Sequence, residues 1–126
     1  MDYCSSNFRF SAEQIAILDF ITQPVAVLHE DTIIFSNGCF AQLCACPREE
    51  ATCRFFSSFV RPKHRNTVQR YLEQLTSNMS ACSVSNVDFT FLATDGTEVQ
   101  VEMHGQQIVF DDQRTILCTL SDVTER

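Results

Sequence analysis

The spacing of hydrophobic and polar residues at the start of the chain predicts a short helix. Within residues 11–20, Ile15 and Leu18 lie three positions apart, so they share one helical face. Ser11 and Gln14 have the spacing of a capping box, in which each side chain bonds to the other residue's backbone. We therefore expect an amphipathic helix that begins after Ser11 and ends before the next proline.

Two short apolar runs follow this helix, and both have the composition of β-strands. They span residues 24–29 and 32–36, and Glu30 and Asp31 separate them. Runs of apolar and β-branched residues around a two-residue polar break are typical of a tight hairpin. We expect His29 to lie in the turn, exposed to solvent.

The middle of the chain is predicted to be helical. Asn37 is expected to be a structural residue that caps the helix after it, and Pro47 suits the first turn of a second short helix. Residues 53–60 lack clear periodicity and are expected to form short helical turns. Residues 62–77 have the strongest helical pattern, because four apolar residues fall on one face. These are Val68, Tyr71, Leu72 and Leu75.

Three strand-like segments complete the chain, at residues 84–93, 97–110 and 115–123. Asp95–Gly96 between the first two is a strong hairpin signal, and the second segment alternates between apolar and polar positions. Strands on both sides of a helical block indicate an antiparallel sheet with helices on one face, which is an α+β fold. A sheet covered in this way leaves a cleft in which small ligands commonly bind.

Composition narrows the classes of function. The 126 residues fit one domain, and 44% hydrophobic residues indicate a globular chain. The net charge of −7 argues against nucleic acid as a partner and against direct contact with an anionic membrane. Because there is no signal peptide and no apolar run that could span a bilayer, we expect a cytoplasmic location, with the seven cysteines as reduced thiols. Three glycines are too few for a phosphate-binding loop, and no catalytic motif is present, so we expect no enzymatic activity.

Five short motifs resemble those of the PAS domain family, and the resemblance covers the chain from about residue 15 to residue 126. In chain order the motifs are NGCF at 37–40, PREEA at 47–51, RPKHRNTVQRYLEQL at 61–75, TDG at 94–96 and SDVTER at 121–126. The resemblance implies a five-stranded antiparallel sheet in the order 2-1-5-4-3, with helices on one face. It also implies two parts, which are a flanking helix at residues 1–20 and the sensor domain itself at residues 21–126.

The resemblance further implies a non-catalytic sensory module that binds a small ligand or senses a cellular cue. The flanking helix is expected to pack on the sheet or on a second copy, in a homodimer. In the family, the SDVTER ending leads to a C-terminal output domain, such as a histidine kinase of a two-component system or a GGDEF-type diguanylate cyclase. We accordingly expect Asp122, Thr124 and Arg126 to transmit the signal to an output domain of the same chain.

A ligand pocket is expected between the helices and the sheet. Ten residues are predicted to line it: Phe40, Leu43, Phe56, His64, Val68, Leu72, Phe89, Phe91, Val101 and Met103. His64 raises an alternative, because a histidine on this helix holds the iron in haem-binding members of the family, where the following residues also end in Arg-Tyr. A ligand-free dimerisation module with a fully packed core is the other alternative.

The cysteines suggest further chemistry, and the sequence favours none of it. TCRFF at 52–56 is similar to the flavin-binding phrase of LOV photoreceptors, but Cys53 falls where the family usually has glycine. Phe91 and Leu120 replace the polar residues that contact the flavin ring, so flavin is not expected. Three more cysteines lack the spacing of a zinc or iron–sulfur site, so no metal is expected, and a redox role stays open. These are Cys39, Cys44 and Cys46.

Overall fold

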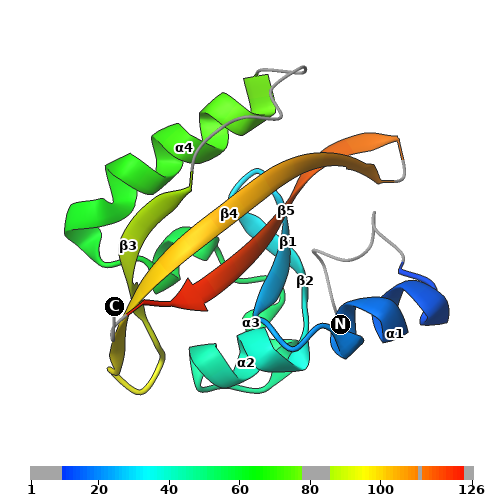
Figure 1. Cartoon of the computed structure of the whole chain (residues 1–126), viewed down its shortest axis with the longest axis horizontal. Coiled ribbons are helices and arrows are strands. Elements are labelled where there is room, and N and C mark those ends of the chain that lie inside the picture. Colours follow the sequence, from blue (N-terminus) through cyan, green and yellow to red (C-terminus); the bar gives the residue numbers. More distant parts are fainter. Residues whose placement is uncertain (1–9, 78–85, 111, 124–126) are drawn as a thin grey trace.

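Five antiparallel strands form one sheet in the order β2-β1-β5-β4-β3 (Figure 1). The computed structural model describes residues 10–77, 86–110 and 112–123. The strands are β1 (Val25–His29), β2 (Thr32–Ser36), β3 (Val87–Leu92), β4 (Glu98–Phe110) and β5 (Gln113–Asp122). The α+β class and the predicted strand order are thereby confirmed.

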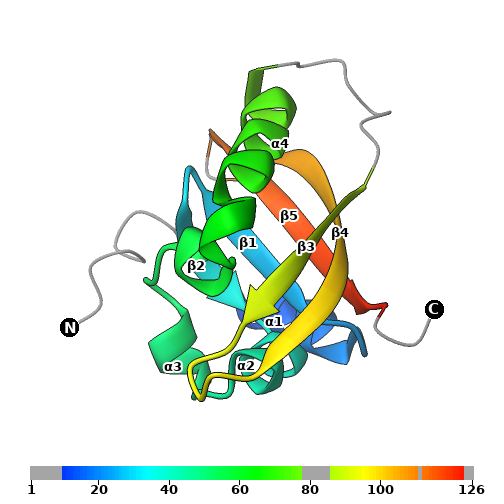
Figure 2. The same ribbon diagram turned by 90° about the vertical axis from the view of Figure 1, so that its left-hand side faces the viewer.

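The helical block between β2 and β3 covers one face of this sheet, as Figure 2 shows from the side. Its elements are α2 (Gly38–Cys44), α3 (Arg48–Ala51), the 3₁₀ turns η1 (Phe56–Phe59) and η2 (Pro62–His64), and α4 (Arg65–Ser77). The predicted long helix therefore begins with a 3₁₀ turn, in which the missing N–H of Pro62 needs no partner.

Helix α1 (Ala12–Phe20) packs on the opposite face of the sheet and begins with the predicted capping box. Its half-buried Ile15 and Leu18 contact a small cluster that includes Val27 and Phe35. Alternate residues of β1 point the other way, so Leu28 belongs to the main core under the helical block. The sheet thus separates two apolar clusters of unequal size.

The structure shows the burial of two histidines, His104 and His29. Met103 is fully buried on the helical side of β4, and the neighbouring His104 is exposed. His29 is the last residue of β1 and is half-buried, so the expectation that it lies exposed in the turn is wrong. The turn consists of Glu30 and Asp31, and Glu30 has a left-handed backbone with φ 58°.

Both outer strands of the sheet have their backbone groups covered by the helical block. Along β2, the Cys53 N–H donates to the Ile33 carbonyl at 2.8 Å, and the Ile33 N–H donates to the Arg54 carbonyl at 2.9 Å. Along β3, the Arg61 N–H donates to the Thr90 carbonyl at 3.0 Å. Unpaired strand edges invite association with other chains, and these contacts cover part of each edge.

Candidate functional site

The space between the sheet and the helices is filled largely by phenylalanine rings. Five rings are at most 1% exposed, and they come from α2, η1 and β3. The rings of Phe59 and Phe91 stack at a centroid distance of 5.3 Å, and Phe40 meets Phe91 edge-on at 5.9 Å. Phe56 meets Phe89 edge-on at 6.1 Å. Such ring pairs add to the free energy of burial, so this cluster anchors the helical block to the sheet.

This cluster contains most of the residues that were predicted to line a ligand pocket. Six of the ten are at most 1% exposed, namely Phe40, Phe56, Phe89, Phe91, Val101 and Met103. Leu43 is partly buried and packs against the same cluster. The structure therefore brings the predicted residues together, and it brings most of them together as packed core.

His64 has a specific hydrogen-bond role at the start of α4. Its Nδ1 accepts the backbone N–H of Thr90 on β3 at 3.1 Å. An imidazole nitrogen that accepts a hydrogen bond carries no proton, so the proton of the neutral ring is on Nε2, and neither nitrogen has a lone pair free for a metal in this arrangement. Because His64 holds η2 and α4 against the edge of β3, the geometry gives this residue a structural role without haem.

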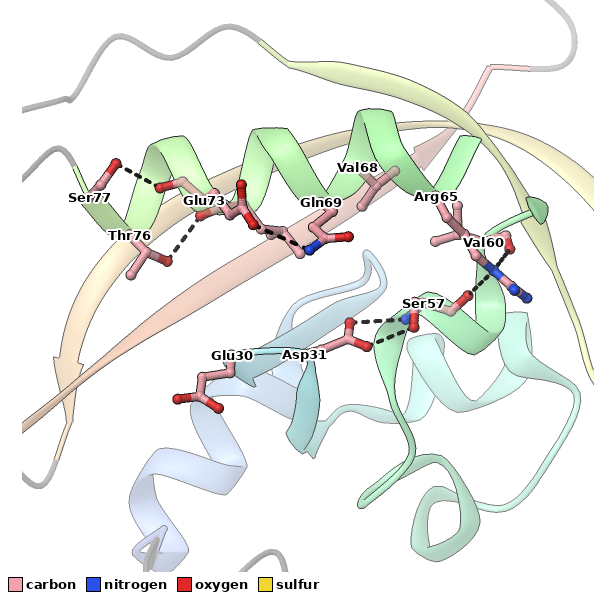
Figure 3. Close-up of a pocket in the computed structure, with 11 residues that line it drawn as sticks. Glu30, Asp31, Ser57, Val60, Arg65, Val68, Gln69, Glu73, Thr76 and Ser77 are labelled. Carbon is pink, nitrogen blue, oxygen red and sulfur yellow. Dashed lines mark hydrogen bonds between the residues drawn. The ribbon is translucent and has the colours of Figure 1, made fainter. Parts of the chain in front are cut away.

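A groove of about 800 Å³ opens beside α4, and it contains the two remaining residues of the prediction, Val68 and Leu72 (Figure 3). One wall is α4, and the other is formed by the β1–β2 turn and η1. The residues that line it are Glu30, Asp31, Ser57, Val60, Arg65, Val68, Gln69, Leu72, Glu73, Thr76 and Ser77. We call this cavity the α4 groove.

Polar contacts hold the two walls of the α4 groove in place. The carboxylate of Asp31 accepts hydrogen bonds from the backbone N–H and the hydroxyl of Ser57, at 3.1 and 2.7 Å. Nε of Arg65 donates to the carbonyls of Ser57 and Val60, at 3.0 and 3.1 Å. These bonds connect the β1–β2 turn to η1 and η1 to α4, so they hold the two walls of the groove in fixed positions relative to each other.

A second cavity of about 370 Å³ lies next to the α4 groove. Glu30 and Thr76 line both cavities, and the second continues to Gln107, Arg114 and Thr115 on the β4–β5 hairpin. The two cavities together follow α4 from its first turn to its last described turn.

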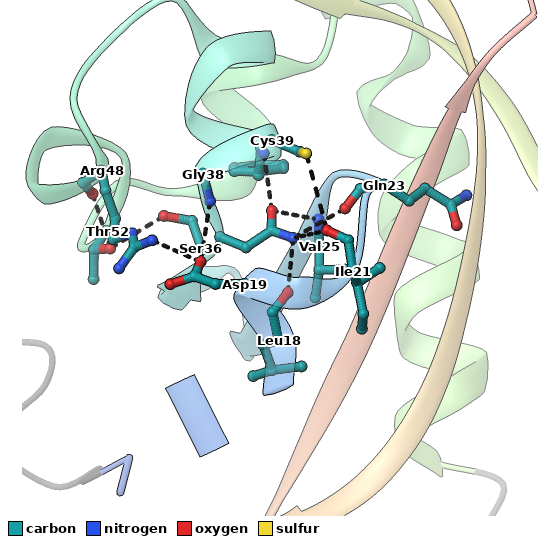
Figure 4. Close-up of polar contacts among 12 residues, drawn as sticks. Leu18, Asp19, Ile21, Gln23, Val25, Ser36, Gly38, Cys39, Arg48 and Thr52 are labelled. Atoms are coloured by element: carbon teal, nitrogen blue, oxygen red, sulfur yellow. Dashed lines mark hydrogen bonds and ion pairs between the residues drawn. The ribbon is translucent and has the colours of Figure 1, made fainter. Parts of the chain in front are cut away.

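Asn37 joins three elements at the start of α2, in the region shown in Figure 4. Its Oδ1 accepts from the N–H groups of Phe40 and Val25, at 2.9 and 3.0 Å. Its Nδ2 donates to the carbonyls of Leu18 and Gln23, at 3.1 and 3.0 Å. The predicted N-cap is confirmed, and the same amide also ties α1 to the sheet.

The ion pair between Arg48 and Asp19 adds a second link between α1 and the helical block, with an N–O distance of 2.6 Å. The Asp19 carboxylate also accepts the Gly38 N–H at 3.3 Å. Both partners of the pair are partly exposed, so its stabilisation is modest, about 0–1 kcal/mol.

The residues predicted to transmit the signal lie at the end of β5. Asp122 is the last residue of that strand and is paired with Val101 of β4. The next residue, Val123, still donates its N–H to the Gln100 carbonyl at 2.9 Å. Thr124 and Arg126 lie outside the described residues, so their proposed role stays a prediction.

The cysteines differ in burial and in covalent state. Cys39, Cys44, Cys46 and Cys118 are free thiols. Burial raises the pKa of the Cys118 thiol to about 12, and burial also raises the pKa of Cys44. Thiols with raised pKa values are poor nucleophiles and poor metal ligands at neutral pH. Among the described residues, no group of three or more histidine, cysteine or acidic side chains is placed to hold a metal ion.

Cys53 departs from what the sequence suggested. It is disulfide-bonded, so the expectation of a reduced thiol is wrong at this position. Its backbone has φ 81°, a left-handed conformation that favours glycine. This conformation agrees with the resemblance described above, in which Cys53 takes the place of a glycine. Cys53 therefore occupies a tight backbone turn.

None of the helices in the described part of the chain is both long enough and apolar enough to span a membrane.

Comparison with known proteins identifies the fold and the family. The family model described as PAS domain matches residues 22–125. No curated protein matched the chain. Among solved structures, the PAS domain of an HTR-like protein from Haloarcula marismortui superposes with a TM-score of 0.73 at 20% identity, over 89% of this chain and 90% of that one.

Two other similar structures come from signalling proteins. A PAS domain from a two-component sensor histidine kinase has a TM-score of 0.65 at 12% identity, over 86% of this chain and 91% of that one. The PAS domain of a LuxR-family transcriptional regulator from Burkholderia thailandensis, solved in complex with ethanol, has a TM-score of 0.67 at 15% identity, over 91% and 99%. At these identities the likeness concerns the fold.

Proposed function

Because the chain belongs to the PAS domain family, we propose that it is a sensory module that binds a small ligand in the α4 groove. The observation that carries this proposal is the groove of about 800 Å³, which lies against a core that is otherwise filled by phenylalanine. Cavities of about 300–1,000 Å³ are typical of small-molecule sites. The ethanol complex of a similar PAS domain supports the same class of ligand.

Substitution of one groove residue by a large side chain tests this proposal. Gln69 lines the groove, whereas Gln74 is exposed on the same helix and is not a lining residue. Gln69→Trp should therefore fill the groove, and Gln74→Trp is a matched control. We would screen a library of small metabolites by thermal unfolding of the wild-type chain and then retest each stabilising compound on both variants.

The expected result is a compound that raises Tm of the wild type and of Gln74→Trp but not of Gln69→Trp. A ligand at 100 times its Kd stabilises a folded protein by about 2.7 kcal/mol, which corresponds to roughly 10 °C in a domain of this size. Stabilisation that survives in Gln69→Trp would place the ligand elsewhere and overturn the assignment of the groove.

The signal is proposed to leave through the end of β5 into an output domain of the same polypeptide. A histidine kinase is one proposed output, supported by the similar PAS domain from a sensor histidine kinase, and a GGDEF diguanylate cyclase is the other. Asp122, Thr124 and Arg126 are the proposed transmission residues. In the full-length protein, Asp122→Ala should change output activity while leaving ligand affinity intact. A parallel loss of both would show that Asp122 supports the fold.

A dimerisation module is the second candidate function, and the exposed face of α1 favours it. Ile17 and Phe20 lie three positions apart on this helix and are 65% and 87% exposed. An exposed apolar pair at helical spacing suits contact with the same helix of a second copy. Ile17→Glu should convert a dimer to a monomer in analytical ultracentrifugation, and Ala12→Glu, at an exposed position on another face of the same helix, is the control. A monomeric wild type would remove this candidate.

A further inference from the structure

The Asn37–Gly38 dipeptide, at the junction of β2 and α2, can react with itself. Glycine has no side chain to shield its backbone nitrogen, so the Gly38 nitrogen can reach the side-chain carbonyl carbon of Asn37, Cγ, when both groups are free to move. A bond forms from this nitrogen to Cγ, the bond from Cγ to Nδ2 breaks, and ammonia leaves with the proton of the Gly38 nitrogen. Water then opens the cyclic succinimide, and residue 37 becomes aspartate or isoaspartate.

In the folded chain, the end of α1 and the residues after it hold the amide that would leave. Asn37 is fully buried. Its Nδ2 donates to the carbonyls of Leu18 and Gln23, at 3.1 and 3.0 Å, and to the carbonyl of Ile21 at 3.4 Å (Figure 4). A primary amide has two N–H groups, so three carbonyls share them and the Asn37 amide is fully used as a donor.

The attacking nitrogen is held by the same helix. The Gly38 N–H donates to the carboxylate of Asp19 at 3.3 Å, and Asp19 is fixed by its ion pair with Arg48 (Figure 4). Gly38 itself is exposed, so the water needed for the second step has access to this junction. The protection of the dipeptide therefore comes from the hydrogen bonds of both reacting groups to α1 and the residues after it.

Conversion of Asn37 to aspartate would keep one of its two structural roles. One carboxylate oxygen would still accept the N–H groups of Phe40 and Val25 that Oδ1 accepts now, and aspartate caps a helix as well as asparagine does. The other oxygen would replace Nδ2 and face the carbonyl oxygens that the amide binds. A buried charge that meets acceptors in place of donors is strongly unfavourable. Helix α2 would stay capped, and α1 would lose its attachment.

We propose that Asn37–Gly38 is a site of spontaneous deamidation that docked α1 protects, and that deamidation releases α1 from the sheet. The two effects reinforce each other. Undocking of α1 frees the amide and the Gly38 nitrogen to react, and the reaction removes the donors that dock α1. The site is separate from the α4 groove, so the inference does not depend on a ligand there.

Mass spectrometry of the peptide that contains residue 37 measures the reaction during incubation of the chain in neutral buffer. Leu18→Ala removes a half-buried side chain that docks α1. Leu75→Val is the control, because it weakens the main core on the other side of the sheet. Since deamidation is slow compared with local opening, its rate follows the fraction of molecules in which the site is open.

Leu18→Ala should deamidate about three- to ten-fold faster than the wild type, because loss of a half-buried leucine removes about half of the transfer free energy of a buried one. Leu75→Val should react at the wild-type rate. An unchanged rate in Leu18→Ala, or equal acceleration in both variants, would overturn the proposal, because α1 would then not control the opening of the site. A wild type that reacts as fast when folded as in urea would overturn it as well.

Asn37→Asp tests the release of α1, because this variant carries the product of the reaction from the start. Hydrogen exchange followed by NMR should show faster exchange of the α1 amides and unchanged protection of α4. Asn66→Asp introduces the same charge at an exposed position on α4 and should leave the exchange of α1 unchanged. Wild-type exchange of α1 in Asn37→Asp would contradict its release. Loss of protection throughout Asn37→Asp would also contradict it, because the amide would then support the whole domain.

Discussion

Replacement of Gly105 by alanine should destabilise the fold, because β4 and α4 approach each other closely at this residue. The Gly105 N–H donates to the hydroxyl of Tyr71 on α4 at 2.9 Å. A Cβ atom at position 105 would lie 2.7 Å from Cδ1 of Leu75 and 3.3 Å from Cγ2 of Ile116. Carbon atoms pack best at about 3.5–4.0 Å, so the alanine methyl would overlap the side chain of Leu75.

The magnitude follows from two opposing contributions. Overpacking of a well-packed core costs about 1–3 kcal/mol, and Leu75 has little room to move because it is only 2% exposed. Alanine regains about 0.5–1 kcal/mol over glycine within a strand, because the unfolded chain loses less backbone freedom. The free energy of unfolding should therefore fall by about 1–2 kcal/mol in Gly105→Ala.

A double-mutant cycle tests this reasoning. Leu75→Val removes the Cδ1 atom that causes the overlap and by itself should cost about 1 kcal/mol. In the Leu75→Val background, Gly105→Ala should cost less than about 0.5 kcal/mol, so the two changes are strongly coupled. Urea unfolding followed by circular dichroism gives the four free energies. A similar cost of Gly105→Ala in both backgrounds, or no cost in the wild type, would refute the steric account.

Three further predictions concern side chains with defined local roles. His64→Leu leaves the buried Thr90 N–H without its acceptor, and the free energy of unfolding should fall by about 1–3 kcal/mol. His64→Asn keeps an acceptor at a similar position and is the control. Equal losses of Tm in the two variants would contradict this role of His64. Ala45 ends α2 with φ 62°, so Ala45→Gly should stabilise the chain against urea by about 0.5–1 kcal/mol. Ala16→Gly inside α1 is the control and should destabilise the chain. Destabilisation by both substitutions would show that the left-handed backbone at Ala45 carries no strain. Burial raises the pKa of Cys118 from 9.0 to about 12, so the folded state keeps a proton that the unfolded chain releases. Cys118 should therefore contribute a fall in the free energy of unfolding of about 1.4 kcal/mol per pH unit above pH 9. Burial raises the pKa of Cys44 as well, so the contribution of Cys118 is the difference in alkaline slope between the wild type and Cys118→Ala, and an unchanged slope would show that this thiol does not contribute.

Local patterns predicted the elements well because each depends on residues close together in the sequence. The capping box at Ser11 and Gln14 and the N-cap at Asn37 are contacts over three residues, and both are present. Val68 and Leu72 were assigned to the inner face of α4 from helical spacing alone, and both line the groove. Element ends shifted by one to three residues where strand pairing begins or stops.

The shape of the site could not be predicted in the same way. Apolar residues such as Phe40 and Phe91 were expected to line a pocket, but whether rings fill a space or border it depends on volumes contributed by separate elements. The sequence analysis did not predict the acidic residues that line the α4 groove, for a related reason. Asp31 and Glu73 each have the sequence context of an exposed polar residue, and only the fold places the β1–β2 turn opposite α4. The partner of His64 lies 26 residues away on β3.

Helix α4 is the physical connection between the groove and the strands that lead to the C-terminus. Its outer face carries Glu73 in the groove, and its inner face holds β4 through the hydroxyl of Tyr71. At its last turn, the amide of Gln107 on β4 donates to the carbonyls of Leu75 and Thr76, both at 2.9 Å. β5 in turn pairs with β4 along the whole length of β5, from Gln113 to Asp122. A ligand that binds more tightly to one position of α4 must therefore either break these hydrogen bonds or move β4 with the helix, and only the second outcome transmits a signal along β5.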